Sequence, residues 1–351
     1  MVIEIDKEFL IGLYEKNEIE FENIISLIKR NINDGINLGI TESNFIYLED
    51  EAYEYLKDYI KDRSFEEYGN NITFIKTYVR KIEKYKIVMN KIIDTKLEIQ
   101  YEFGLLKYLL TSCPIVVTEN INDKKIYQCI LNSFSKYKLK QEYQNGNGSQ
   151  VPLTLKDNLN DGKISAVITD RDEKYKGEIN RSSTPSKVKE MIYELTKEKK
   201  NNKLYLHHII INYKNIEGLI PYRYIIENLS DKTKNHFDEM YKMQKDKEWL
   251  KYFDFKKGIN KNLKNDKKNF IEDSVEWWKN QFNLKEDFKD FIESRVANIK
   301  DILISGISSC CLNNLEQNDF KEKSSEEQKK EYIRLVNLIE PLLIVNYYEV
   351  Q

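Results

Sequence analysis

The sequence has few of the residues that hold zinc or form disulfide frameworks. Among 351 residues there are three histidines and four cysteines, and the cysteines include no Cys-x-x-Cys pair. Neither a zinc site nor a set of disulfides can therefore be read from their spacing. We expect the four thiols to be reduced and to pack as small hydrophobic groups. They are Cys113, Cys129, Cys310 and Cys311.

Long hydrophobic runs and nucleotide-binding loops are missing as well. No apolar stretch approaches the ~18 residues that a membrane-spanning helix needs. The first residues, 1–6, are acidic where a secretory signal carries basic residues, so we expect a cytoplasmic protein that does not contact membranes. The chain lacks Gly-x-Ser-x-Gly, a Walker A loop, and a Gly-x-Gly-x-x-Gly after a predicted strand. These absences argue against a serine hydrolase, a P-loop ATPase and a dinucleotide-dependent enzyme.

Charge of one sign is not in excess either. The 56 Lys and Arg residues nearly balance the 58 Asp and Glu residues, and the hydrophobic content is 40%. A chain of this length and composition can bury a substantial core. Its net charge does not indicate a nucleic-acid partner, so any such contact would have to be a local basic patch.

Two apolar segments in the middle of the chain end on acidic residues. The segment 114–118 is followed by Glu119, and the segment 164–169 is followed by Asp170 and Asp172. Apolar runs of this kind predict buried strands of a parallel sheet. If both strands belong to one sheet, the carboxylates meet at the edge where open α/β sheets bind ligands. Three carboxylates so close together repel one another unless a cation lies between them.

The segments around these strands alternate regularly between strand and helix patterns. Such alternation predicts a parallel sheet covered by helices on both faces, with its βα loops at one edge. That edge would also receive the Gly-containing loop 145–149, which by itself predicts a turn. It would receive a helix start with Thr184 as N-cap, where a phosphate is favoured. The predicted strands are 114–118, 138–143, 164–169 and 203–211, and the predicted helices are 122–135, 150–159 and 185–199.

This arrangement resembles the Toprim fold, which topoisomerases, primases, overcoming-lysogenization-defect nucleases and bacterial phage-defence effectors share. The resemblance covers residues 113–230 and rests on Glu119 after the first strand, the Asp-x-Asp at 170–172 and the βα alternation between them. It extends to the segment 215–221, which is similar to an acidic segment after the fourth strand in the defence-associated branch. Many members have Gly after the motif glutamate, where this chain has Asn120. Asn tolerates a positive φ better than most residues do.

The acidic residues suit a hard divalent cation. Carboxylate oxygens without nearby His or Cys favour Mg²⁺ or Mn²⁺. We expect Asp170 and Asp172 to hold the ion and Glu119 to complete its ligands or to act as general base. Asp123 and Glu217 are candidates for a second ion or for orienting the other ligands. The alternative for each aspartate is a helix cap, a turn residue or a local ion pair.

The resemblance implies a metal-dependent nuclease that hydrolyses phosphodiester bonds of DNA or RNA, tRNA included, as an effector of an anti-phage defence or toxin system. It also implies a separate ATPase or sensor protein as partner, and a homo-oligomer is a further expectation. The alternative is a non-catalytic nucleic-acid-binding or assembly protein of such a system. In that case the acidic residues would be structural.

The flanking regions, 1–112 and 231–351, show helical periodicity and are predicted to be helical. In the C-terminal region four lysines are candidates for contacting a phosphate backbone: Lys256, Lys257, Lys261 and Lys264. Aromatic residues just before them either stack on bases or anchor the segment to the core. Within the strand 203–211, His207 and His208 are expected to be core histidines with hydrogen-bond partners.

Overall fold

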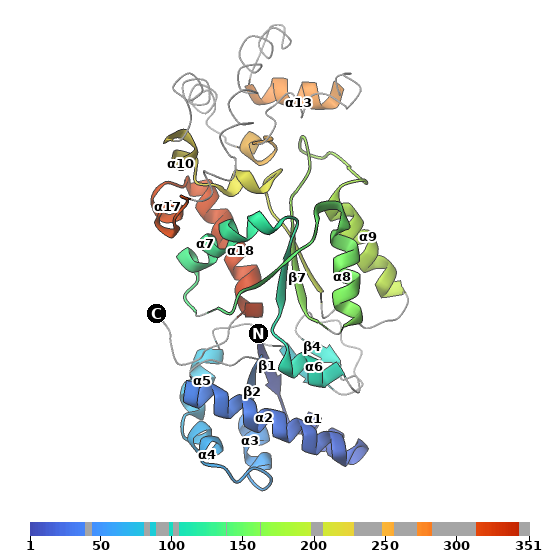
Figure 1. Cartoon of the computed structure of the whole chain (residues 1–351), viewed down its shortest axis with the longest axis vertical. Helices are drawn as coiled ribbons and strands as arrows, with labels where there is room; N and C mark the ends of the chain where they lie inside the picture. Colours follow the sequence, from blue (N-terminus) through green and yellow to red (C-terminus); the bar gives the residue numbers. More distant parts are fainter. Residues whose placement is uncertain are drawn as a thin grey trace.

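The computed structural model describes residues 1–38, 44–80, 85–88, 98–100, 105–137, 139–161, 163–197, 206–227, 248–255, 272–282 and 314–343. It contains two four-stranded sheets in which every strand pair is parallel. In Figure 1 the first sheet lies below the second. The predicted α/β fold class with a parallel sheet is confirmed. In the described part of the chain, no helix is long and apolar enough to cross a membrane.

The first sheet is formed by residues that were predicted to be helical, so the prediction for residues 1–112 was wrong in this respect. Its strands have only three or four residues each, too few to show a period in the sequence. Within this region, for example, a helix at Ile72–Val79 is followed by a strand at Tyr85–Val88. The strands, in the spatial order β2-β1-β3-β4, are β1 (Val2–Ile5), β2 (Phe45–Leu48), β3 (Tyr85–Val88) and β4 (Glu98–Gln100). The helices are α1 (Lys7–Lys16), α2 (Glu18–Leu38), α3 (Asp50–Leu56), α4 (Arg63–Asn70), α5 (Ile72–Val79) and α6 (Leu105–Thr111).

The second sheet is the one that the sequence predicted. Its strands, in the order β6-β5-β7-β8, are β5 (Ile115–Thr118), β6 (Glu142–Asn145), β7 (Ser165–Thr169) and β8 (Leu206–Ile210). Their helices are α7 (Lys124–Phe134), α8 (Val151–Asn160) and α9 (Thr184–Lys197). β6 begins four residues later than predicted. Lys140, within the predicted strand, donates its backbone N–H to the carbonyl of Leu343 instead of pairing with β5.

Helices cover both faces of this second sheet. α7 and the C-terminal helix α18 (Glu326–Leu343) lie on one side of β7, and α8 and α9 lie on the other (Figure 1). The central strands β5 and β7 are mostly apolar, and all five residues of β7 are buried. Such strands need cover on both faces. The remaining short elements are α10 (Tyr222–Glu227), α13 (Glu272–Phe282), α17 (Gln317–Glu322) and the 3-10 turns η1 (Ile121–Asp123), η2 (Gly148–Gln150), η4 (Ile216–Leu219) and η5 (Glu248–Lys251).

Both sheets have the same strand order. In each, the second strand lies on one side of the first, and the third and fourth lie on the other. The order reverses between the first and third strands, which are β5 and β7 in the second sheet. Open α/β sheets bind ligands outside the carboxyl ends of the strands at this point. The two acidic motifs follow these two strands.

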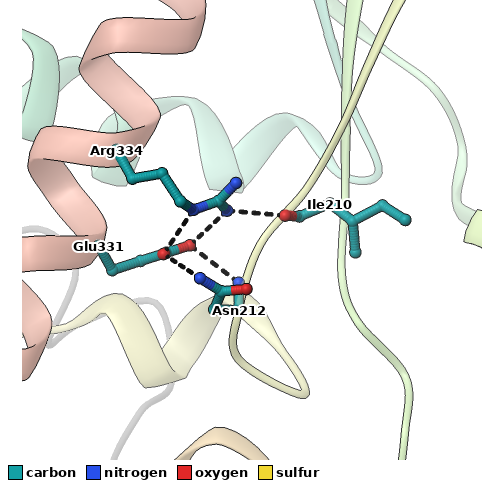
Figure 2. A network of polar contacts seen from close by, with 4 residues as sticks. All are labelled: Ile210, Asn212, Glu331 and Arg334. Atoms are coloured by element: carbon teal, nitrogen blue, oxygen red, sulfur yellow. Dashed lines mark hydrogen bonds and ion pairs between the residues drawn. The ribbon is translucent and has the colours of Figure 1, made fainter.

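A polar network attaches α18 to the chain that leaves β8 (Figure 2). The buried carboxylate of Glu331 accepts hydrogen bonds from the backbone N–H of Asn212 (2.8 Å) and from its side-chain amide (2.6 Å). Arg334 donates to Glu331 (2.7 Å) and to the carbonyl of Ile210 (2.8 Å). One turn earlier, Gln328 donates to the carbonyl of Ile220 (2.7 Å). α18 therefore fixes the backbone on both sides of residues 213–219.

Candidate functional site

Glu119 and Asp170 lie side by side at the carboxyl ends of β5 and β7. The two strands are neighbours, with Thr118 opposite Ile168. The carboxylate of Glu119 accepts a hydrogen bond from the backbone N–H of Asp170 (3.0 Å), although the two residues are 51 positions apart. Both side chains are half-buried. The two acidic motifs are thus in direct contact at the switch point of the sheet.

Tyr127 belongs to the same site, and the sequence reasoning did not single it out. Its hydroxyl is fully buried, and burial raises the pKa of Tyr127 well above its ordinary value. The negative charges of Asp170, Asp123 and Glu119 raise this pKa further, because each disfavours a second anion nearby. The charges of three carboxylates therefore act on one buried hydroxyl. The sequence feature that could have identified Tyr127 is its spacing from Asp123, because the two residues lie one helical turn apart.

Asp123 also has a structural role. It accepts a hydrogen bond from the backbone N–H of Asn120 (3.0 Å) in a capping box that starts η1. Asn120 has an extended backbone, with φ of −132°, so this turn does not need the positive φ that glycine would allow. The carbonyl of Asn120 accepts a hydrogen bond from the Thr118 hydroxyl (2.9 Å). The helix-cap alternative thus applies to Asp123.

Asp172 lies beside the chain that leaves β8, next to Lys214. The backbone N–H groups of Arg171 and Asp172 donate to the carbonyls of Tyr213 and Lys214, each at 3.1 Å, so the motif runs beside the chain that leaves β8. Asp172 has a φ of +60°, a conformation that aspartate tolerates better than most residues. Its negative charge acts on the buried Lys214. Nowhere in the described ranges are three or more His, Cys, Asp or Glu side chains grouped so that they could hold a metal ion.

Glu217 is placed on η4, in the segment that α18 holds. It is buried, so it is not an exposed acid of a solvated turn. The carbonyl of the following residue, Gly218, accepts a hydrogen bond from Gln328 of α18 (3.1 Å). The position of Glu217 therefore depends on the C-terminal helix.

The Gly-containing loop uses its amides on β5 instead of offering them to a phosphate. Gly146 donates to the carbonyl of Thr118, and Gly148 donates to the carbonyl of Glu119, both at 2.7 Å. A Cβ atom at Gly146 would lie 2.6 Å from Val151 and 2.9 Å from the Thr118 carbonyl, so only glycine fits. The loop is the turn that its sequence predicted, and it holds the backbone of Glu119 in place.

The helix start near Pro185 differs from its prediction by one residue. Ser183, not Thr184, is the N-cap of α9, and its hydroxyl oxygen accepts a hydrogen bond from the backbone N–H of Ser186 (3.4 Å). Ser183 is buried, and its hydroxyl also donates to the carbonyl of Asn180 (2.8 Å). An N-cap at Thr184 would not have this hydrogen bond between the Ser183 hydroxyl and the Asn180 carbonyl.

The aromatic residues that precede the basic stretch anchor the chain to the core. The side chains of Trp249, Tyr252, Phe253 and Phe255 are at most 3% exposed, so they are not available for stacking on bases. Trp278 of α13 is also buried and donates its indole N–H to the carbonyl of Lys174 (3.1 Å), in the loop after Asp172. This aromatic group therefore packs against the loop. The lysine candidates Lys256, Lys257, Lys261 and Lys264 lie outside the described residues.

His208 is a core histidine, as predicted, and it makes stability depend on pH. Its Nε2 lies 2.9 Å from the Thr169 hydroxyl, and burial, followed by the charge of Lys189, lowers its pKa from 6.5 to about 4. Because the unfolded chain binds the proton more tightly, the contribution of His208 to stability is present above pH 6.5 and is lost as the pH falls toward 4.

We expect this loss to be about 3 kcal/mol of unfolding free energy. The measurement is urea unfolding of the wild type and of His208→Gln at several pH values between 4 and 7. Other groups titrate in both proteins, so the difference between the two isolates His208. A difference that does not change with pH would contradict the assignment.

No protein-family model, curated protein or solved structure matches this chain. What the chain does must therefore be inferred from its own residues.

Proposed function

We propose that the chain is a metal-dependent nuclease whose active site lies at the carboxyl ends of β5 and β7. The supporting observation is the hydrogen bond between the Glu119 carboxylate and the backbone of Asp170, which joins the two acidic motifs at the switch point of the sheet. The same two motifs carry the resemblance to Toprim nucleases. A role in an anti-phage defence or toxin system, with a separate ATPase or sensor as partner, is proposed from that resemblance alone.

In this proposal Glu119, Asp170 and Asp172 supply hard oxygen ligands for Mg²⁺ or Mn²⁺. A bound divalent ion would stabilise the charge that develops on the phosphate during hydrolysis. Glu119 is oriented by the Asp170 N–H and by the loop that contacts its own backbone, so it is positioned either as a further ligand or as the base that takes the proton from water.

Asp123 and Glu217 have less direct roles in the proposal. Asp123 is committed to the η1 cap and adds negative charge near Asp170, which favours a cation in the site. Glu217 lies on the segment that also carries Lys214, the residue next to the Asp172 backbone. We assign both residues to orienting the site or to a second ion.

The experiment is a cleavage assay of the purified chain on plasmid, single-stranded DNA and total tRNA with Mg²⁺, Mn²⁺ or EDTA. We expect cleavage of at least one substrate with either metal and none with EDTA. Melting curves with the same metals accompany the assay, because an ion that binds the folded state raises its stability, by about 2.7 kcal/mol at 100 times Kd. No cleavage together with no metal-dependent shift would contradict the proposal and favour the binding or assembly protein.

A further inference from the structure

Lys214 is a buried cation directly beside the Asp-x-Asp motif. Its side chain is 7% exposed. Its backbone is held from two sides, because its N–H donates to the carbonyl of Lys251 (2.6 Å) and its carbonyl accepts from Asp172 (3.1 Å). The next residue, Asn215, donates to Asp254 (3.1 Å), and Asn212 is held by Glu331. The position of Lys214 is therefore set by β7, η5 and α18 together.

The ammonium group of Lys214 has charged neighbours but no contacting acceptor. Among the residues that the structure describes, it makes no hydrogen bond and no ion pair within 4 Å. Asp254, Glu178 and Asp172 act on it from a greater distance. Two of these carboxylates are engaged elsewhere, since Asp254 accepts from Asn215 and Glu178 accepts from the backbone of Lys174 (2.5 Å).

Lys214 is largely enclosed by the protein, and a charge that is only partly solvated and has no contacting anion is unfavourable. An anion that reached the ammonium would remove much of the desolvation penalty, because a direct charge-assisted hydrogen bond is about twice as strong as a neutral one. Lys214 is therefore suited to bind an anion.

We infer that Lys214 contacts a phosphate group of the substrate at the edge of the sheet next to Asp172. Lysine binds phosphate as a compact point charge. Arg171, the cation within the Asp-x-Asp motif, is paired with Glu173 (2.8 Å), so Lys214 supplies a second positive charge beside the motif. The identity of the ligand as a nucleic-acid phosphodiester rests on the proposed nuclease function, whereas the anion contact itself does not.

The test uses the full chain in EDTA, with inorganic phosphate as the probe and sodium chloride at equal ionic strength as the reference. We expect phosphate to raise the melting temperature of the wild type and of Lys214→Arg, and to give no such increase in Lys214→Met. Lys163→Met is the matched control, since it removes a lysine at the opposite end of β7 that is paired with Asp161 (2.8 Å). Lys163→Met should respond to phosphate as the wild type does.

If Lys214→Met does not fold, Lys214→Gln replaces it. A wild type that responds equally to phosphate and chloride overturns the inference, and so does a Lys214→Met variant that responds as the wild type does. In that last case Lys214 only balances the charges of its acidic neighbours.

Cleavage kinetics separate this inference from the proposed function. Where the wild type is active, Lys214→Met should lower kcat/KM by about 10²- to 10³-fold, as the loss of one preorganised contact does. Cleavage that Lys214→Met retains in full, with an unchanged phosphate response, overturns the role of Lys214 and leaves the nuclease intact. A Lys214-dependent phosphate response without any cleavage keeps the anion site and overturns the nuclease.

Discussion

Asp170→Asn is expected to lower the metal-dependent nuclease activity about a thousandfold, a loss of roughly 4 kcal/mol of transition-state stabilisation. Asparagine keeps the shape of the side chain and removes the charge that a hard divalent ion requires. The substitution leaves the backbone N–H that holds Glu119, so the fold should be retained. Glu119→Gln should have a similar effect on activity, because its amide oxygen can still accept from that N–H. The measurement is the initial rate of cleavage under the conditions that activate the wild type.

The control for these variants is Asp161→Asn, which removes a carboxylate near the amino end of β7, away from the site. Asp161 is exposed and forms an ion pair with Lys163, and such pairs contribute at most about 1 kcal/mol. Its activity should equal that of the wild type. Melting temperatures of all three variants show whether the fold is retained. Full activity in Asp170→Asn, in a folded protein, would contradict the metal site.

Glu331→Ala is expected to lower the unfolding free energy by about 3 kcal/mol, because it leaves the Asn212 donors without their acceptor and removes a buried charged partner of Arg334. The carboxylate of Glu331 is 4% exposed and joins Arg334 to Asn212, so its removal leaves the Arg334 guanidinium with only the Ile210 carbonyl in this network (Figure 2). Because α18 fixes the segment that carries Lys214 and Glu217, the phosphate response should weaken together with the stability. Urea unfolding measures the stability directly.

The same helix offers a matched control. Glu326 has the same charge, is 78% exposed at its side chain and pairs with Lys329 within one turn. Glu326→Ala should change stability by no more than about 0.5 kcal/mol. Equal effects of the two substitutions would show that the buried network does not stabilise the docking of α18.

The central sheet could be predicted because its strands carry a strong local signal. The five residues of β7 are all buried and its three central residues are apolar, and the acidic residues after its end mark where the buried stretch stops. The start of α18 has an equally local signal, because Ser325 and Gln328 exchange hydrogen bonds of a capping box (3.2 and 3.1 Å). Such signals lie within a few residues and do not depend on the rest of the fold.

The first sheet could not be predicted for the opposite reason. β1 and β4 have four and three residues, and their pairing partners lie 43 positions later and 12 positions earlier in the chain. Short strands become strands through those partners, since their backbone groups are satisfied only in the sheet. Their side chains alone do not distinguish them from the helical segments around them.

By itself, the sequence determined that the chain is α/β, that its central strands are parallel, and that Glu119 and Asp170 follow two of them. Only the tertiary structure decided that these residues touch, that three carboxylates act on the buried hydroxyl of Tyr127, and that Lys214 is buried beside Asp172. The physical reason is that strand order and burial are set by contacts between segments far apart in the chain. From the sequence alone, a lysine in a loop is expected to be exposed to solvent, and only the structure shows the segments that enclose it.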